Sequence, residues 1–388
     1  AEAKRNVVWV EPKIVAQVAY LEATPDGHLR HPSYLGLRED KQAKDVAVGS
    51  SSVSAASGSM GKTTVRKSRT KRFPKAAKAT VAKTSRKSSP AKVFGQRLTS
   101  PDKLLWPDAG ITKLDLAKYL DEFSAHLLPF VKGRPLSIVR CPEGYQGECF
   151  FQKHHNPSTP DAIETMKIKG KKGGAEDYLI IRNKAGLVGA AQIGGLELHV
   201  WGSREDMIEK PERLVFDLDP DEGLDFSHVK KTALELRDIL ESVGLKSFPL
   251  LTGGKGIHVI APIARTREWE EVKAFCKGLA QMVAKSSPDR YVAQASKAKR
   301  EGRIFIDWLR DERGSTAIAP FSPRRRDNAP VATPVSWKEL PKMDSGAAFT
   351  MKTIGHRLAK QKSDPWQGYA TASRQSLKLA AIEAVSGD

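Results

Sequence analysis

The sequence predicts an α+β fold with a mixed sheet. Segments of strand character outnumber helical segments, and neighbouring strands are often joined by short turns. The chain has 388 residues, which allows two or more domains and at least one sizeable core. No apolar run approaches the ~20 residues that span a bilayer, so we expect no membrane partner.

Charge and composition divide the chain into four parts. Its formal net charge is +19, which predicts a polyanionic partner such as nucleic acid. Twelve lysines and arginines lie from Lys62 to Lys92, and no acidic residue occurs between Asp45 and Asp102. We therefore expect a β-rich segment at 1–45, a basic disordered linker at 46–92, a globular domain at 93–345 and a C-terminal extension at 346–388. The linker is compatible both with a solubilising spacer and with a weak nucleic-acid tether.

The first 45 residues look like the tail of a β-barrel. Residues 7–10 and 14–20 have strand character, and residues 24–27 read Thr-Pro-Asp-Gly, a turn. Forty residues are too few to bury an independent core.

The remaining elements follow from periodicity and punctuation. Thr112 predicts the start of a helix through Leu128, which Pro129 would end. Gly244 predicts the end of a second helix that begins near Val229. Further predicted elements are strands at 136–139, 149–152, 178–181, 196–201, 211–220, 248–251, 257–261 and 303–307 and a helix at 268–285.

Three cysteines, Cys141, Cys149 and Cys276, form no CxxC pair. The spacing therefore indicates neither a zinc site nor a disulfide framework, and it fits a reducing cytoplasm.

The strongest chemical signal is the run from Pro211 to Pro220. An apolar strand leads into Asp217 and Asp219, whose side chains share one face because residues alternate along a strand. Asp307 ends another short strand. Three carboxylates on two strands repel each other unless a cation lies between them, so we expect Mg²⁺ or Mn²⁺, as two ions of a nucleotidyl-transfer site.

The two aspartates of the first strand also fit other kinds of site. An EF-hand loop counted from Asp217 would need Gly and Glu where Glu222 and His228 stand, so that reading fails. An aspartyl-nucleophile phosphatase also fits Asp-x-Asp after a strand, and two solvated carboxylates remain the simplest alternative.

Residues 251–258 form a glycine-rich turn between two strands. The N–H groups of Gly253 and Gly254 could hold phosphate oxygens, with Lys255 adding charge, although the spacing is not that of a P-loop. His199 and His258 each sit in an apolar strand and suit either a structural role or a triphosphate contact.

Basic and aromatic residues surround these motifs. Arg310 follows Asp307 and suits a contact with the triphosphate of a nucleotide. Arg326 belongs to an arginine run, 324–326, and suits a contact with the DNA backbone; a solvated basic face is the alternative for both. Phe150 and Phe151 precede Lys153, which predicts base stacking beside a cation unless both rings are buried on opposite sheet faces.

Together these motifs resemble the polymerase domain of bacterial ATP-dependent ligase D, in the archaeo-eukaryotic primase superfamily, from about Arg97 to Leu340. The resemblance implies a primase-polymerase fold with mixed and antiparallel sheets flanked by helices. It implies that Asp217, Asp219 and Asp307 bind divalent metal and catalyse. It further implies that His199, Thr252, Lys255 and His258 hold the triphosphate of an NTP or dNTP, with Thr252 where Ser is more usual.

The same resemblance suggests how DNA is bound. Lys103 and Lys113 would bind the 5′-phosphate of a broken end, and Phe150 and Phe151 would stack on bases. Family members add nucleotides, preferring ribonucleotides, during non-homologous end joining with a Ku-type partner, which implies a place in the bacterial nucleoid.

Residues 6–45 resemble the C-terminal part of the ligase OB-fold, so an incomplete OB-fold-like segment would precede the polymerase. The Lys-x-Asp-Gly motif of the adenylated lysine is absent, so we expect no nick sealing, and the ligase and phosphoesterase domains would lie outside this sequence. The leading hypothesis is a metal-dependent nucleotidyltransferase that fills gaps and extends ends. A non-catalytic basic DNA-end scaffold is the alternative, since charge alone explains DNA binding in both.

Overall fold

A computed structural model describes the backbone of residues 16–19, 22–23, 29–30 and 33–37, and residues 89–170, 173–296 and 299–386. The chain divides into two compact units, Ala1–Ala82 and Lys83–Asp388. Among the described residues, no helix is both long and apolar enough to cross a membrane.

The first unit contains two small antiparallel pairs. β1 (Ala16–Ala19) pairs with β4 (Ser33–Leu37), and β2 (Glu22–Ala23) pairs with β3 (Leu29–Arg30). The expected strand at 14–20 therefore exists as β1. The expected strand at 7–10, the turn at 24–27 and the linker from 46 to 88 lie outside the described residues.

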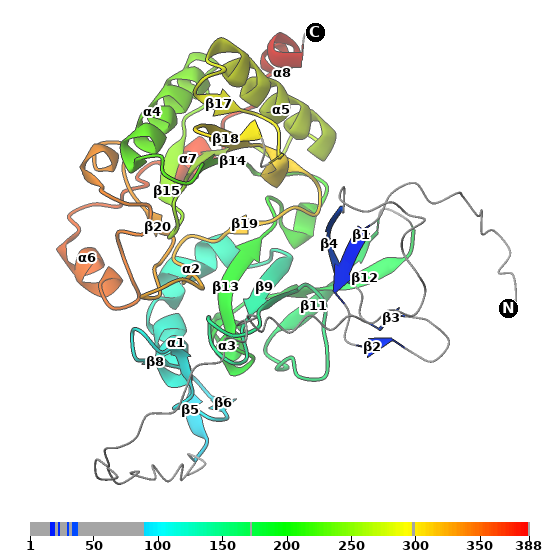
Figure 1. Cartoon of the computed structure of the whole chain (residues 1–388), viewed down its shortest axis with the longest axis vertical. Coiled ribbons are helices and arrows are strands. Elements are labelled where there is room, and N and C mark those ends of the chain that lie inside the picture. Colours follow the sequence, from blue (N-terminus) through cyan, green and yellow to red (C-terminus); the bar gives the residue numbers. More distant parts are fainter. Residues whose placement is uncertain are drawn as a thin grey trace, which may run out of the picture. The chain divides into compact units, whose positions relative to one another are not determined.

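The second unit carries the rest of the secondary structure (Figure 1). Its strands are β5 (Ala91–Val93), β6 (Gln96–Leu98), β7 (Leu104–Trp106), β8 (Ile111–Thr112), β9 (Leu136–Arg140), β10 (Phe150–Gln152), β11 (Glu164–Lys169), β12 (Ala175–Ile180), β13 (Gly195–Val200), β14 (Arg213–Pro220), β15 (Phe248–Leu251), β16 (Ile257–Pro262), β17 (Tyr291–Val292), β18 (Ile304–Asp307), β19 (Ala317–Ile318) and β20 (Thr333–Pro334). Its α-helices are α1 (Lys113–Glu122), α2 (Ser124–Val131), α3 (Lys184–Gln192), α4 (Phe226–Ser242), α5 (Trp269–Ser286), α6 (Ile354–Lys360), α7 (Tyr369–Ala372) and α8 (Leu379–Ser386). Short 3-10 helices are η2 (Glu205–Met207), η4 (Leu309–Asp311) and η5 (Leu340–Lys342).

Two sheets organise this unit. One has four strands in the order β10-β9-β13-β19, all antiparallel. The other has six strands in the order β17-β18-β14-β16-β15-β20, antiparallel except for the β17–β18 pair. The predicted α+β class with mixed and antiparallel sheets is therefore confirmed.

Apolar side chains of β14 point alternately to the two faces of the six-stranded sheet, so each face is covered. Leu214, Phe216 and Leu218 of β14 are buried in one core with the apolar stripes of α4 and α5, which lie along that face in Figure 1. Val215 points the other way, into a core that includes Trp366. Burial of both faces of β14 leaves only its C-terminal end, with Asp217 and Asp219, partly open to solvent.

The predicted helix at 112–128 is correct at its start and wrong at its end. The Thr112 hydroxyl accepts the Asp115 N–H, and the Asp115 carboxylate accepts the Thr112 N–H, a reciprocal cap. The helix breaks at Phe123, and Pro129 lies inside α2 instead of ending it. Proline costs a short helix one backbone donor, and the burial of Leu127 and Val131 outweighs that loss.

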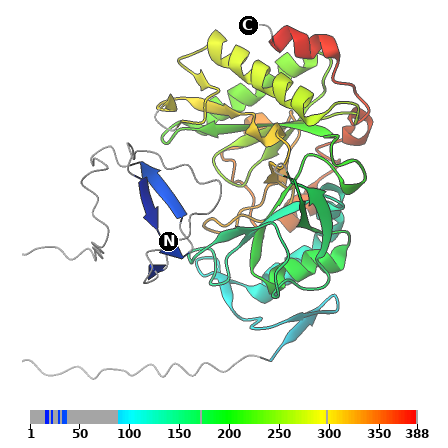
Figure 2. The same cartoon turned by 90° about the vertical axis from the view of Figure 1, so that its right-hand side faces the viewer.

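The domain boundaries also differ slightly from expectation. β5 begins at Ala91, two residues before the predicted start of the folded domain. The extension from 346 packs into the same unit, because Ile354, Trp366 and Leu377 belong to three buried clusters. Figure 2 shows the last helix, α8, beside α5.

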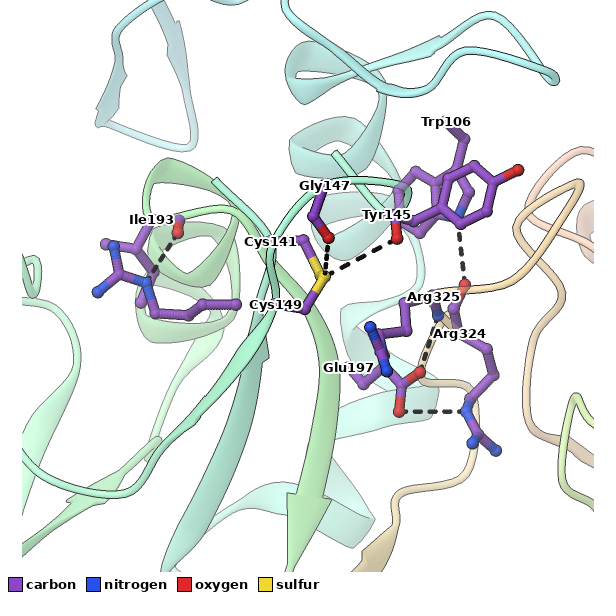
Figure 3. The surroundings of a disulfide bond; sticks show 10 residues. Trp106, Cys141, Tyr145, Gly147, Cys149, Ile193, Glu197, Arg324 and Arg325 are labelled. Carbon is purple, nitrogen blue, oxygen red and sulfur yellow. Dashed lines mark hydrogen bonds and ion pairs between the residues drawn. A yellow bond between two sulfur atoms is a disulfide. The ribbon is translucent and has the colours of Figure 1, made fainter. Parts of the chain in front are cut away.

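The expectation of no disulfide is wrong, because Cys141 and Cys149 form one (Figure 3). Arg140 and Phe150 are register partners in the β9–β10 pair, so the next residue outward on each strand faces the other. The two Cα atoms are 4.3 Å apart. A spacing of eight residues gives no such signal until the hairpin register is known. Cys276 is a buried free thiol.

Reducing this disulfide is expected to lower the melting temperature by about 5 °C, because the crosslink closes a short loop worth ~2–3 kcal/mol of unfolded-state entropy. Thermal unfolding with and without a dithiol measures the shift. A variant with Cys141→Ala and Cys149→Ala should not respond to reductant. An unchanged melting temperature of the reduced protein would contradict the stabilising role.

Candidate nucleotidyl-transfer site

The three predicted aspartates meet on adjacent strands of the six-stranded sheet. Asp217 of β14 is the register partner of Asp307 of β18, and Asp219 follows two residues later on the same face. On its other side, Asp217 is the register partner of His258 of β16. The strand order β18-β14-β16 thus brings together three carboxylates and a histidine that are far apart in the sequence.

Arginines face these carboxylates. Arg310 Nη2 lies 3.3 Å from Asp217 Oδ2 and 3.1 Å from Asp307 Oδ2. Arg300 Nη1 lies 2.7 Å from Asp219 Oδ2. In the part of the chain that the structure describes, no group of three His, Cys, Asp or Glu side chains is arranged to hold a metal ion. The backbone register and the oxygen donors suit a hard cation, but the side chains would have to turn from the arginines toward it.

The acidities of the three aspartates differ. Burial opposes ionisation of Asp217, but His258 and then Arg310 hold its pKa well below the usual range. Burial, and then the Asp217 charge, raise the pKa of Asp219. Burial also raises the pKa of Asp307, against the attraction of Arg310. This crowding of carboxylates is the electrostatic situation that an added cation relieves.

The glycine turn is built more tightly than the sequence indicated. The Thr252 hydroxyl donates to Gly256 O at 2.9 Å, and the Gly253 N–H donates to Gly346 O at 2.8 Å. Gly253 has φ +70, a conformation that favours glycine. Two of the expected phosphate-binding groups are therefore engaged within the protein. Gly254 and the half-exposed Lys255, whose Nζ lies 3.5 Å from Glu222, remain at the surface of the turn.

The two predicted histidines occupy different environments. His258 is only 3% exposed, and its Nε2 lies 3.4 Å from Asp217 Oδ1. Its ring therefore contacts a predicted metal ligand. His199 is partly exposed on β13, and its ring lies 5.9 Å from that of Phe151 in an edge arrangement. The prediction that both contact a triphosphate stays a prediction.

Sequence reasoning missed Glu197, and it considered Arg324 only as part of an arginine run suited to triphosphate or DNA backbone contacts. Glu197 is buried, and its carboxylate accepts bonds from His199 Nε2 at 2.7 Å and from the Arg325 N–H at 2.8 Å. Arg324 Nε lies 3.2 Å from the same carboxylate (Figure 3). Its Nη1 donates to Thr252 O. The alternation of 196–201 already placed Glu197 on the face of His199, a signal that could have found it.

The aromatic pair is exposed, so burial on opposite sheet faces is excluded. Phe150 and Phe151 are 43% and 65% exposed, and they lie on β10, the edge strand of the four-stranded sheet. Lys153 is exposed directly after this strand. The Arg140 guanidinium lies 5.3 Å from the Phe150 ring centroid. Exposed rings beside cations are the surface on which unpaired bases stack.

The two predicted phosphate-binding lysines are neighbours. The Lys113 N–H donates to Lys103 O at 2.8 Å, and Lys113 opens α1 as expected. Burial, and then the Lys103 charge, lower the pKa of Lys113. Lys113 Nζ donates to two carbonyls, Thr99 O and Gln192 O, at 3.0 and 3.1 Å. Lys103 Nζ is bonded to Glu143 at 2.6 Å.

Arg326 lies at the glycine turn. A Cβ built on Gly254 would be 3.3 Å from Arg326 Nε, so this guanidinium covers the turn beside Lys255. The structure thus brings Arg326 together with the residues predicted for the nucleotide, although the sequence placed it with DNA.

Comparison with known proteins agrees with this architecture. Residues 112–366 match the family model of the LigD primase-polymerase domain, and residues 1–41 match that of the ATP-dependent DNA ligase C-terminal region. The solved polymerase domain of Mycobacterium tuberculosis ligase D in complex with DNA is 31% identical, with a TM-score of 0.65, over 70% of this chain and 97% of that one.

Longer relatives match as well. The multifunctional non-homologous end joining protein LigD of Pseudomonas aeruginosa is 33% identical over 383 residues, 97% of this chain and 42% of that protein. The bifunctional non-homologous end joining protein LigD of Bacillus subtilis is 30% identical over 266 residues, 68% of this chain and 43% of that protein. The chain thus spans less than half the length of these relatives. It belongs to the family of LigD primase-polymerase domains.

Proposed function

We propose that this protein is a metal-dependent nucleotidyltransferase that fills gaps and extends ends in non-homologous end joining. The observation that carries the proposal is the register of Asp217 with Asp307 on one side and with His258 on the other, with Asp219 two residues further along β14. Membership in the LigD primase-polymerase family supports it. The reaction joins a primer 3′-oxygen to the α-phosphorus of a nucleotide, and pyrophosphate leaves.

Asp217, Asp219 and Asp307 would hold two Mg²⁺ or Mn²⁺ ions, which supply charge neutralisation and lower the pKa of the attacking hydroxyl. The protein would supply the carboxylate ligands of these ions. His258 keeps the Asp217 carboxylate ionised and oriented on β14. Arg310 pairs with Asp217 and Asp307, and it would turn to the triphosphate when divalent ions take these two carboxylates.

The nucleotide would lie between β13 of the four-stranded sheet and the glycine turn of the six-stranded sheet. His199 on β13 and the turn with Thr252, Gly253, Gly254 and Lys255 would face its phosphates, with His258 on β16, the strand that follows the turn. Phe150 and Phe151 would stack on bases of the DNA, with Lys153 near the backbone. We propose, in line with the family, that ribonucleotides are preferred and that a Ku-type end-binding protein is a partner.

A labelled primer with a templating overhang tests this function. Extension by single NTPs and dNTPs is expected with Mn²⁺ or Mg²⁺ and is expected to vanish with a chelator. Comparison of the two sugars reads the ribonucleotide preference. DNA binding without extension under every metal condition would favour the basic scaffold. Release of phosphate from a phosphomonoester would favour the phosphatase. We also propose that the chain seals no nicks. Incubation of a nicked duplex with the protein and ATP is expected to give no ligated strand.

The Lys103–Glu143 pair suggests a measurable effect on DNA ends. An ammonium group has three donors, and Lys113 uses two on carbonyls, so one remains for a terminal phosphate. Lys103 is occupied by Glu143, which a phosphate would have to displace.

Glu143→Gln is therefore expected to tighten binding of gapped DNA with a 5′-phosphate, by about twofold to fivefold, the size of a surface ion pair. Fluorescence anisotropy with 5′-phosphate and 5′-hydroxyl gaps measures the effect. Glu148→Gln, a change of charge in the same loop, is the matched control. An equal gain for both ends would indicate general electrostatics instead of competition at Lys103.

A further inference from the structure

Glu197 is a buried carboxylate at the centre of contacts that join the two sheets. It lies on β13, and it accepts bonds from His199 Nε2, two residues on, and from the Arg325 backbone N–H. Arg324 Nε lies 3.2 Å from the same Oε2 that His199 contacts. Two hydrogen-bond donors and the Arg324 guanidinium charge therefore converge on one side chain, as Figure 3 shows for the two arginines.

The protonation of this group fixes the orientation of His199. Burial opposes ionisation, but His199, Arg324 and the Arg325 N–H together lower the pKa of Glu197 to about 2. An ionised carboxylate only accepts, so His199 Nε2 must carry the proton in their 2.7 Å bond. The ring nitrogen left for any other partner is Nδ1. A histidine held in this way has one tautomer and one direction, as in metal and catalytic sites where a carboxylate supports the ring.

Arg324 links Glu197 to the glycine turn. Its Nη1 donates to the carbonyl of Thr252, and a Cβ built on Gly253 would be 2.7 Å from Arg324 Cγ. Only glycine allows the arginine stem to lie so close. The Arg324 carbonyl is held in turn by Nε1 of the fully buried Trp106, at 3.1 Å. The turn at 252–256 and His199 are therefore placed relative to each other through one carboxylate.

We propose that Glu197 is a positioning residue for nucleotide binding. It presents His199 Nδ1 to the triphosphate, and it holds Arg324 against the turn that receives the same phosphates. Glu197 itself does not touch the nucleotide, because its oxygens are already engaged and a second anion beside them would be repelled. This inference rests on the proposed function of the site.

Steady-state addition of a single nucleotide tests the proposal with Glu197→Gln. Loss of this contact is expected to raise KM for the nucleotide about 10- to 100-fold, the size of hydrogen bonds to charged groups, with kcat within about threefold. DNA affinity should be unchanged. The matched control is Glu212→Gln, a part-buried carboxylate that contacts Arg134 and Arg204 at the other end of β14. It should lower the melting temperature without changing KM.

A double-mutant cycle separates positioning from general destabilisation. If Glu197 acts through His199, Glu197→Gln adds less to KM in a His199→Ala background than in the unmutated protein. Full additivity, or an unchanged KM in the single variant, would overturn the inference. If Glu197→Gln does not fold, His199→Ala and Arg324→Gln replace it, and their effects on KM must then be less than additive. Full additivity of that pair overturns the inference too. Absence of addition by the unmutated protein would instead reject the proposed function.

Discussion

Asp217→Asn is expected to lower nucleotide addition by roughly 10³-fold, the loss typical when a charge-stabilising group is removed from an active site. Asp217 is the carboxylate that lies between Asp307 and His258 on adjacent strands, so every candidate ligand arrangement includes it. Its amide keeps the volume and removes the charge. Affinity for duplex DNA should stay within about twofold, because the basic surface is untouched.

The measurement is single-turnover extension of a labelled primer, with DNA affinity measured in parallel. Glu222→Gln is the matched control, since this exposed carboxylate lies near the same strand end and pairs with Lys255. Addition by the Asp217→Asn variant within tenfold of the unmutated rate would contradict the metal assignment. Equal losses in both variants would indicate a general effect of negative charge.

The second large effect concerns the broken end. Lys103→Ala combined with Lys113→Ala is expected to remove the preference for a 5′-phosphate at a gap, a change of about 10- to 100-fold in Kd for that substrate. The two lysines are adjacent, and each retains a donor that a phosphate could use once Glu143 is displaced. Addition to a simple primer-template should persist, because the aspartates lie on the six-stranded sheet, whereas Lys103 precedes β7 and Lys113 opens α1.

Anisotropy with phosphorylated and hydroxyl gaps measures the preference. Lys118→Ala, an exposed lysine of the same helix, is the control for loss of one positive charge. Lys113 also holds Thr99 and Gln192, so melting temperatures must accompany each value. Equal affinity of the unmutated protein for both gaps would rule out the phosphate pocket.

Sequence patterns predicted an element correctly where the deciding residues lie within the element itself. The alternation in 211–220 gave β14 its buried and open faces, and Thr112 capped α1 through its own side chain. Such signals depend on neighbours within four residues, so no knowledge of the fold is needed. Pro129 misled for the opposite reason, because tertiary burial of α2 decided whether a missing donor mattered.

The sequence by itself determined the α+β class, the basic charge and the candidate aspartates, histidines and aromatic residues, because residue type and short spacing carry those signals. The two lysines predicted to bind the broken end came from the family resemblance alone. Only the tertiary structure decided their partners. Strand order set Asp217 beside Asp307 and His258, hairpin register joined Cys141 to Cys149, and the approach of the 319–332 segment to β13 gave Glu197 its arginines. These contacts join residues separated by up to 128 positions, and no local periodicity encodes which strands become neighbours.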